Sequence, residues 1–307
     1  MTAITVANQN PSFFGEAPEA FMGQQGVKPK PDFYFSAVDN YQEDQLAQLM
    51  PDAKPLKFGG DRPAETAILC LHGFTAMPYG VRPIAEYCAR AGFDTFAPVL
   101  PGHGWQDPKR QRQALSQITR AQLLAAVRTE VAKLRDRYQR VYVYGDSMGG
   151  ALAFALASEG LVDACAATAP ALLLPFRGEF LSRYFGWLNI NIPKKMSGRF
   201  YSPCYPFENS RAGRALWEVS HYTRDRLDQV TCPAFIAHSR KDVTIPAAST
   251  QLASDRCQGS LEVQWFDLSG HVLPLDIQGP DVSQAIADFF GKINLDQTKE
   301  SKLNQGN

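Results

Sequence analysis

The chain has 307 residues, of which 45% are hydrophobic and 20% are charged, so it suits one large or two small globular domains rather than a disordered chain. Lys and Arg (31) balance Asp and Glu (31), and this zero net charge disfavours a general nucleic-acid binder, which needs clustered basic residues. No apolar run reaches the roughly 18 residues of a transmembrane segment, and the N-terminus lacks a basic and apolar signal. We therefore expect a cytoplasmic protein. Its six scattered cysteines favour free thiols over disulfides or a zinc site.

The two ends of the chain differ from its middle in composition. Residues 1–55 have weak periodicity and many Pro, Gly, Gln and Asn residues, so we expect an N-terminal arm that is loose over about its first thirty residues. Within the arm, 39–50 favour a short helix, and 55–58 favour a strand. After about Ile293 the sequence is polar, and we expect 293–307 to be a tail that frays.

Between these ends, short apolar strands alternate with helices. The strands are expected at Thr66–Leu71, Thr95–Ala97, Val141–Tyr144, Ala164–Thr168, Ala234–Ser239 and Leu261–Phe266. The helices are expected at Val81–Ala91, Ala121–Tyr138, Gly149–Ser158 and Val282–Phe290. Because most of the strands are apolar throughout, the pattern predicts an α/β fold with a mostly parallel central sheet flanked by helices. We expect this core to comprise 56–169 and 223–292.

Residues 170–222 interrupt the alternation of strands and helices. The segment holds eleven aromatic residues, and its seven Lys or Arg residues outnumber three Asp or Glu residues. An insertion of this kind in an α/β domain predicts an aromatic-rich cap or lid. Its aromatic side chains would line an apolar pocket or build a small core of the cap itself. Its mild positive charge suggests weak contact with a lipid interface.

The central motif is Gly145-Asp-Ser-Met-Gly149, which lies between a predicted strand and a helix of small residues. This context predicts a nucleophile elbow, a tight turn that exposes Ser147 at the start of the helix. Gly145 and Gly149 are expected to be required because a Cβ atom there would collide with the neighbouring strand and helix. The alternative is a glycine-rich turn with an incidental serine.

A serine hydroxyl needs a base to remove its proton, and the base needs an acid that stabilises its charged form. His271 follows the last predicted strand, which is where this fold order places the base. Asp242 follows the penultimate strand and is the favoured acid. The competing acids are Asp225, Asp228, Asp267 and Asp276.

The tetrahedral intermediate needs donors for its oxyanion. The backbone N–H groups of Met148 and Phe74 are the candidates, and Phe74 belongs to the run His72-Gly-Phe-Thr75 after the first strong strand. We interpret His72 as part of this oxyanion loop and His103 as a residue that holds a loop.

Three other polar residues have less certain roles in the sequence. His238 ends a strand and is expected to be a packed core histidine. A binding role for His221, in the insertion, has little support. Asp146 is expected to make a local structural hydrogen bond rather than to select a substrate.

The chain resembles the α/β-hydrolase superfamily, and within it the bacterial carboxylesterase and monoacylglycerol lipase group. The resemblance covers about 56–292 and rests on five runs: Leu71-His-Gly-Phe-Thr75, Val99-Leu-Pro-Gly-His-Gly104, Gly145-Asp-Ser-Met-Gly-Gly150, Arg240-Lys-Asp-Val-Thr-Ile-Pro246 and Ser269-Gly-His-Val272. It implies a Ser147–Asp242–His271 triad, no metal and no organic cofactor. It further implies a small-molecule ester of a short- to medium-chain acid as substrate, with the acyl chain under the cap.

Two other readings of the motifs remain open. Thioesterases and carbon–carbon bond hydrolases use the same three residues on the same fold. A hydrolase fold without activity that binds a ligand or partner is less favoured, because all three positions are filled. Dehalogenases and epoxide hydrolases are disfavoured, since they carry Asp at the position of Ser147.

Overall fold

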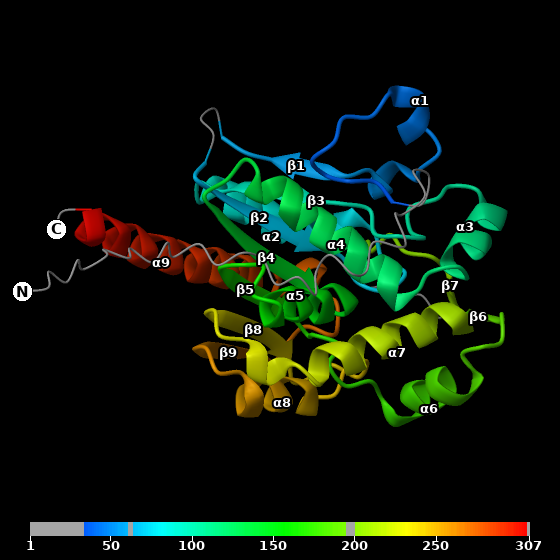
Figure 1. The fold of residues 1–307 in the computed structure, drawn as a ribbon. Coiled ribbons are helices and arrows are strands. Elements are labelled where there is room, and N and C mark those ends of the chain that lie inside the picture. Colours follow the sequence, from blue (N-terminus) through cyan, green and yellow to red (C-terminus); the bar gives the residue numbers. More distant parts are fainter. Residues whose placement is uncertain (1–33, 61–63, 195–199, 306–307) are drawn as a thin grey trace, which may run out of the picture.

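The computed structural model describes residues 34–60, 64–194 and 200–305, and its centre is a seven-stranded sheet (Figure 1). The strand order is β1-β3-β2-β4-β5-β8-β9, and only β1 runs antiparallel to its neighbour. The strands are β1 (Leu56–Phe58), β2 (Thr66–Leu71), β3 (Asp94–Ala97), β4 (Arg140–Asp146), β5 (Ala164–Thr168), β8 (Ala234–Ser239) and β9 (Leu261–Phe266). The predicted α/β fold with a mostly parallel sheet is therefore confirmed.

The central strands are buried on both faces, which explains their continuous apolar sequences. Every residue of β2, β5 and β8 is buried, and the edge strand β9 alternates between exposed and partly covered positions. In the parallel register Leu71 pairs with Gly145, and Asp146 pairs with Thr168. The carboxyl ends of β2, β4 and β5 therefore meet at one edge of the sheet, where ligands bind in open α/β folds.

Helices cover both faces of the sheet. One face packs against α2 (Arg82–Arg90) and α9 (Gly279–Gln305), and the other against α4 (Arg120–Arg135) and α5 (Met148–Ser158). The remaining helices of the core are α3 (Pro108–Leu115) and α8 (Ala248–Arg256), which the sequence did not indicate. All residues of α5 are buried, because the helix lies between the sheet and other helices. None of the helices in the described part of the chain is long and apolar enough to cross a membrane.

The described part of the N-terminal segment packs onto the core. Phe35 pairs with Val99, and the buried Glu130 of α4 accepts hydrogen bonds from the Tyr34 hydroxyl and from the Ala37 N–H. A short helix, α1 (Glu43–Leu46), lies within the expected 39–50 segment. Residues 34–58 thus form an anchored layer, whereas the expected looseness of about the first thirty residues lies outside the described residues.

The expectation of a frayed tail after Ile293 differs from the structure. Helix α9 continues as far as Gln305. The apolar periodicity ends near Phe290, but no Pro or Gly lies between Ile293 and Gln305, and most residues there favour helix. Nothing in the local sequence therefore stops the helix at the point where it leaves the core.

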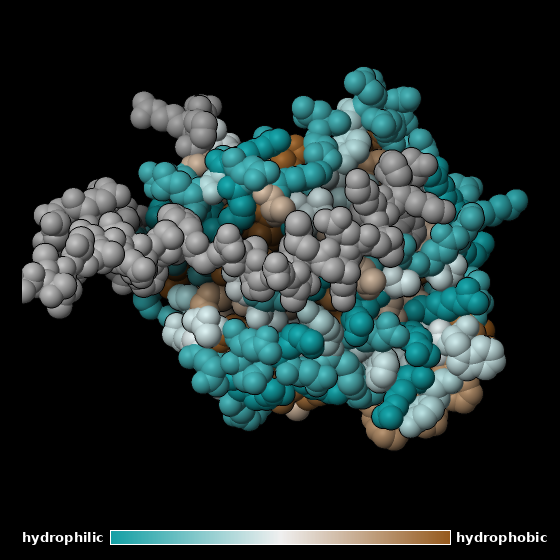
Figure 2. Space-filling view, in the orientation of Figure 1, coloured by the Kyte–Doolittle hydropathy of each residue, from teal (hydrophilic) through white to brown (hydrophobic). Residues whose placement is uncertain are grey.

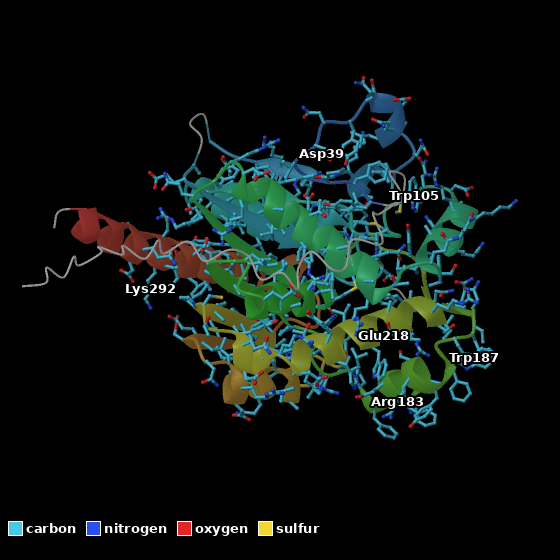
Figure 3. All side chains as sticks on the ribbon, viewed as in Figure 1. Asp39, Trp105, Arg183, Trp187, Glu218 and Lys292 are labelled. Atoms are coloured by element: carbon cyan, nitrogen blue, oxygen red, sulfur yellow. The ribbon has the colours of Figure 1, made fainter. Side chains whose placement is uncertain are left out.

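The long connection between β5 and β8 forms a layer at the carboxyl edge of the sheet (Figure 1). It contains α6 (Phe176–Phe185), the antiparallel pair β6 (Asn191–Pro193) and β7 (Phe207–Asn209), and α7 (Ser210–Arg224). Its aromatic residues divide into two groups: Tyr205 and Phe207 are buried, whereas large apolar side chains of α6 are exposed. Figure 3 shows Arg183 and Trp187 at the outer margin of this layer, away from the sheet.

Candidate active site

Ser147 lies at a sharp turn between β4 and α5. Its backbone has φ 53° and ψ −109°, a left-handed conformation that is unfavourable for a residue with a side chain. The turn is fixed on both sides, because Ser147 N–H donates to the Thr168 carbonyl and the Ser147 carbonyl accepts from Ala151 and Ala171. The strain is thus held by the neighbouring strand and helix.

Two glycines permit this turn for steric reasons. A Cβ atom at Gly145 would lie 2.0 Å from the Gly149 carbonyl oxygen, and one at Gly149 would lie 2.0 Å from the Leu71 carbonyl oxygen. Both obstacles are backbone atoms, which cannot rotate away as a flexible side chain could. The turn therefore packs α5 directly against the ends of β2 and β4.

The structure brings Ser147, His271 and Asp242 together. Nε2 of His271 lies 3.0 Å from Oγ of Ser147, and its Nδ1 lies 2.7 Å from Oδ2 of Asp242. Ser147 is 9% exposed, and the imidazole of His271 is 17% exposed, so both groups are largely covered by the protein. A base within hydrogen-bond reach of a hydroxyl, oriented in turn by a carboxylate, can activate that oxygen as a nucleophile.

The carboxylate of Asp242 is buried and fully engaged. Oδ1 accepts the N–H groups of Thr244 and Ile245 at 2.7 and 2.9 Å, and Oδ2 faces His271 and His238. Burial by itself raises the pKa of Asp242, but polar contacts with the two histidines and the Ile245 N–H outweigh burial and hold this pKa well below its usual range. The group facing His271 is therefore an anion.

The other candidate acids lie elsewhere. Asp267 is exposed and pairs with Arg240 at 3.2 Å, Asp228 pairs with Arg256, and Asp225 ends α7. Asp276 has a supporting role, because its Oδ2 accepts the Gly270 N–H at 2.6 Å and so holds the loop that carries His271. Of the five acids considered, only Asp242 meets the base.

The segment 72–75 lies beside the nucleophile. A Cβ atom added at Gly73 would be 3.5 Å from Cβ of Ser147, so no side chain separates this segment from the turn. Phe74 and Met148, the proposed backbone donors, thus belong to segments that meet at Ser147. Thr75 (φ 59°) has left-handed backbone, like Ser147, and the two lie in the segments that follow the adjacent strands β2 and β4.

Two buried histidines hold the 72–75 segment against the neighbouring loop. Nε2 of His72 accepts the Leu100 N–H at 3.0 Å, and Nε2 of His103 accepts the Thr75 N–H at 3.1 Å. Burial lowers the pKa of His72 to about 3 and that of His103 to about 4. Both rings are therefore neutral at physiological pH and remain acceptors, so they act as supports rather than as bases.

Asp146 makes the expected local bond. Its Oδ1 accepts from the Thr168 hydroxyl at 2.6 Å, and the Tyr144 hydroxyl lies 2.8 Å from the same threonine oxygen. The other carboxylate oxygen approaches Gly73, where a Cβ atom would be 3.3 Å away. Burial raises the pKa of Asp146 from 3.8 to about 6, although the charge of His271 and the Thr168 bond oppose the rise.

The connection between β5 and β8 is tied to the 72–75 segment through backbone and side-chain contacts that the motifs did not indicate. Tyr205 N–H donates to the Thr75 carbonyl at 2.9 Å, and Lys194 Nζ donates to the Thr75 hydroxyl at 3.1 Å. The Tyr205 hydroxyl accepts the Trp105 N–H at 2.9 Å. Aromatic content pointed to a cap but could not show which ring is buried at its base, because the segment has no regular periodicity.

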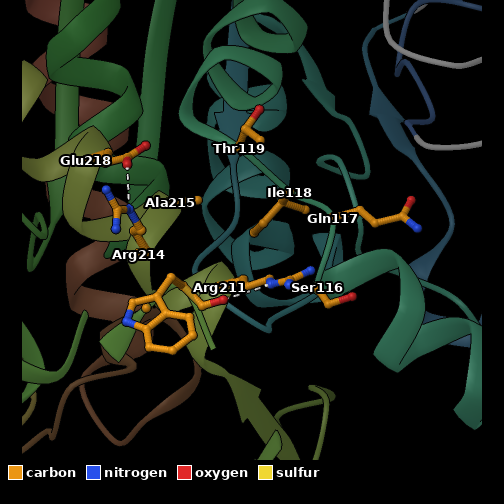
Figure 4. A pocket seen from close by; sticks show the side chains of 10 residues that line it. Ser116, Gln117, Ile118, Thr119, Arg211, Arg214, Ala215 and Glu218 are labelled. Carbon is orange, nitrogen blue, oxygen red and sulfur yellow. Dashed lines mark hydrogen bonds and ion pairs between the residues drawn. The ribbon is translucent and has the colours of Figure 1, made fainter. Parts of the chain in front are cut away.

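A cavity of about 450 Å³ lies away from Ser147, between the start of α4 and the cap (Figure 4). It is lined by Ile118, Ala215 and polar residues such as Arg211 and Arg214, and Arg214 is ion-paired with Glu218. No member of the Ser147 cluster lines it, so we do not place the reaction there. Among the described residues, no group of three or more His, Cys, Asp or Glu side chains is arranged to hold a metal ion.

Comparison with known proteins gives consistent matches. Residues 66–276 match the family model of the alpha/beta hydrolase fold. The chain is 28% identical over 233 residues to a thermostable monoacylglycerol lipase of Bacillus sp. (strain H-257), covering 73% of this chain and 90% of the lipase. It is 26% identical over 255 residues to a carboxylesterase of Bacillus subtilis (strain 168), covering 78% of this chain and 97% of the carboxylesterase.

Solved structures agree with this match. A structure from work on the metagenome-derived lipolytic enzymes LipS and LipT has a TM-score of 0.73 at 25% identity, covering 80% of this chain and 100% of that one. The monoacylglycerol lipase of Paleococcus ferrophilus has a TM-score of 0.66 at 15% identity, covering 78% and 98%. At 15% identity, the similarity to the Paleococcus ferrophilus lipase shows a shared fold and nothing more.

Proposed function

Because the chain belongs to the alpha/beta hydrolase fold family, we propose that it is a serine hydrolase of carboxylic esters, of the carboxylesterase or monoacylglycerol lipase type. The observation that carries the proposal is the contact of Ser147 Oγ with His271 Nε2 at 3.0 Å, continued to Asp242 at 2.7 Å. The lipase and carboxylesterase relatives support the choice of an ester as substrate.

In the proposed acylation step, Oγ of Ser147 attacks the ester carbonyl carbon while Nε2 of His271 takes the hydroxyl proton. The carbonyl oxygen becomes an oxyanion, which the N–H groups of Met148 and Phe74 stabilise. The intermediate collapses with cleavage of the carbon–oxygen bond, and His271 gives its proton to the departing alcohol. The anionic Asp242 stabilises the imidazolium that exists between these two transfers.

Deacylation repeats the sequence with water. His271 removes a proton from a water molecule, the hydroxide attacks the acyl carbon, and the proton passes back to Oγ of Ser147 as the carboxylic acid leaves. The neutral rings of His72 and His103 keep the 72–75 segment in place through both steps. We propose that the acyl chain is of short to medium length and lies beneath the cap, which meets this segment at Tyr205.

The experiment is a rate series with p-nitrophenyl esters from acetate to palmitate, together with Ser147→Ala and with labelling by a fluorophosphonate. We expect a maximum at one chain length, complete loss of that activity in the variant, and labelling of the unmodified protein at Ser147. Labelling without cleavage of any ester would transfer the proposal to a thioester or carbon–carbon substrate. A folded protein that is neither labelled nor active would instead be a binding protein.

We further propose that α6 contacts the surface of aggregated lipid substrate. Its exposed apolar side chains cover the outer margin of the cap, where Figure 2 shows pale and brown atoms at the lower right. The most exposed are Phe176 of α6 (83%) and Trp187, which lies just beyond the end of that helix (64%). The neighbouring Arg177 and Arg183 would favour anionic headgroups. Exposed apolar patches of this kind on a soluble domain commonly mark interaction sites.

The test compares a soluble ester with monoacylglycerol above its critical micelle concentration. Replacing both Phe176 and Trp187 by Ser should lower the rate on the aggregate and leave the rate on p-nitrophenyl butyrate unchanged. Leu295→Ser is a matched control, because Leu295 is 63% exposed on α9 and remote from the cap. Equal rates on the aggregate for both proteins would contradict contact through α6.

A further inference from the structure

A second histidine lies on the far side of the carboxylate of Asp242. His238, in β8, is fully buried, and its Nε2 is 3.3 Å from Oδ2 of Asp242, the same oxygen that meets Nδ1 of His271 at 2.7 Å. Nε2 of His238 is not aligned for a regular hydrogen bond with any described residue, so its contact with the carboxylate is mainly electrostatic. Asp242 therefore lies between two imidazole rings.

The ring of His238 is held from two other directions. Its Nδ1 lies 2.7 Å from Oγ1 of Thr250 in α8, and its face stacks on Trp265 of β9 with centroids 5.4 Å apart and an interplanar angle of 13°. An unprotonated Nε2 would direct its lone pair at the negatively charged carboxylate oxygen, which is repulsive. The favoured neutral tautomer therefore carries its proton on Nε2, and Nδ1 accepts from the Thr250 hydroxyl.

We propose that His238 is a positioning residue for ester hydrolysis, whose Nε2–H shares Oδ2 of Asp242 with His271 and keeps this carboxylate charged and directed at the base. The inference rests on the proposed function, since it assigns a role within the same site. His238 does not touch the substrate in this role. It acts only through Asp242.

The physical reason is the cost of a buried carboxylate. The Asp242 side chain is 1% exposed, and such a group loses its charge or orientation unless its oxygens find donors. Oδ1 has two backbone donors, whereas Oδ2 would have only the Nδ1–H of His271, whose ring alternates between neutral and charged as its Nε2 takes and returns a proton. A donor that does not take part in the proton transfer keeps Oδ2 stabilised throughout the cycle.

Among the residues that the structure describes, Asp242 is the carboxylate within ion-pair distance of His238, and its other contacts are uncharged. Helix α8 contributes Thr250, and β9 contributes Trp265. The nearest described cation on its own segment, Arg240, is engaged with Asp267 at 3.2 Å and lies 5.0 Å from the ring of Trp265. The carboxylate of Asp242 is the charged group that His238 faces.

The experiment uses two amides that each reproduce one ring nitrogen. In His238→Gln the amide nitrogen lies near the position of Nε2 and can still donate to Asp242. In His238→Asn it lies near the position of Nδ1 and faces Thr250. His238→Leu removes both nitrogens, and His221→Asn, at a histidine of α7, is the control for a general effect of losing a histidine.

We expect His238→Gln to retain at least about a third of the wild-type kcat. The Asn and Leu variants should lose about 10- to 100-fold in kcat, the scale of removing an N–H that faces a buried charged group, with KM within about twofold. Their acid limb of kcat/KM should move to higher pH, because the carboxylate then acts on His271 alone. A merely structural role would lower the rate equally at every pH.

Equal rates in the Gln and Asn variants, or an unchanged acid limb in both, would overturn the inference. If the Leu variant does not fold, the comparison of the Gln and Asn variants still tests the role of His238. The rate of fluorophosphonate labelling at Ser147 separates the two proposals. If no ester is cleaved but labelling follows the order Gln above Asn, the role of His238 stands and ester hydrolysis fails. If the unmodified protein is not labelled, both fail.

Discussion

Nε2 of His271 lies within 3.0 Å of Oγ of Ser147, although 124 positions separate the two residues in the chain. The parallel sheet accounts for this, because every parallel strand ends at the same edge and the loops that follow β4, β8 and β9 meet there. The hydrogen bond therefore depends on the order of the strands. Each loop needs to supply only one side chain.

Replacing Ser147 by Ala should abolish ester hydrolysis without harming the fold. The rate should fall by at least about 10³-fold, since the reacting oxygen is removed. The melting temperature should change little, because the three backbone hydrogen bonds of residue 147 remain. Circular dichroism and a p-nitrophenyl ester assay measure the two quantities. Appreciable turnover by the folded variant would mean that another residue is the nucleophile.

Asp242→Asn should be severely impaired, whereas the matched variant Asp267→Asn should behave as the wild type. The amide would favour the wrong tautomer of His271 and could not stabilise its charge, which predicts a fall in kcat of about 10³- to 10⁴-fold. Asp267 is exposed and pairs with Arg240 at the surface. Steady-state kinetics of both variants give the comparison. The opposite order of effects would assign the acid to Asp267.

Asp146→Asn should change how stability depends on pH. The folded state raises the pKa of Asp146 to about 6, so it binds the proton more tightly than the unfolded chain, and the wild type loses stability as the pH rises from about 4 through about 6. The variant does not titrate and can still accept from Thr168. From pH 4 to pH 7, the free energy of unfolding of the variant should rise relative to that of the wild type by at most about 3 kcal/mol.

Urea unfolding at pH 4, 5, 6 and 7 tests this prediction, with Asp267→Asn as the exposed control. Parallel curves for the wild type and Asp146→Asn would show that the carboxylate has an ordinary pKa. A divergence that grows towards acid pH instead would reverse the sign of the shift.

Two Gly→Ala substitutions should have opposite effects. Gly149→Ala places a methyl group against the backbone of Leu71 and should destabilise the fold by about 3 kcal/mol or more. Gly291→Ala lies in α9 with open space around the new methyl group and should stabilise it by about 0.5–1 kcal/mol. Thermal unfolding of both variants is the measurement, and tolerance of Ala at 149 would refute the tight contact of α5 with β2.

Truncation should separate the N-terminal arm into two parts. Removal of residues 1–30 should leave the melting temperature nearly unchanged if that part is loose. Removal of 1–41 also deletes Tyr34, Phe35 and Ala37, which contact α4 and the loop after β3, and should lower the melting temperature by at least about 5 °C. A large loss from the shorter truncation would show that the first thirty residues pack on the core.

The sequence alone indicated the core of the fold because its signals are local. Strands buried on both faces are continuously apolar, and the Gly145–Gly149 motif needs a strand before it and a helix after it. The connection at 170–222 gave no such signal, since the residues of α6 and α7 are interrupted by loops and short strands without a repeating period. The length of α9 was missed because its last turns extend beyond the apolar face that identifies a helix.

Within the candidate site, the residues identified in advance are those whose chemistry the reaction needs. The supporting contacts are different in kind. Nothing in the local sequence around His238 shows that Thr250 and Trp265 hold its ring, because these residues come from α8 and β9 and meet only in the folded sheet. Histidine four residues before an aspartate is too common a pattern to predict their contact.

The cap enters from β5 and returns to β8, and these strands are neighbours in the sheet. The nucleophile, its base and its acid all lie outside that single connection. Mutation and recombination can therefore rebuild the cap without altering the register of the sheet or the three reacting side chains. In an evolving lineage, a new preference for acyl groups can be acquired through one contiguous stretch of the gene while the chemistry is inherited unchanged.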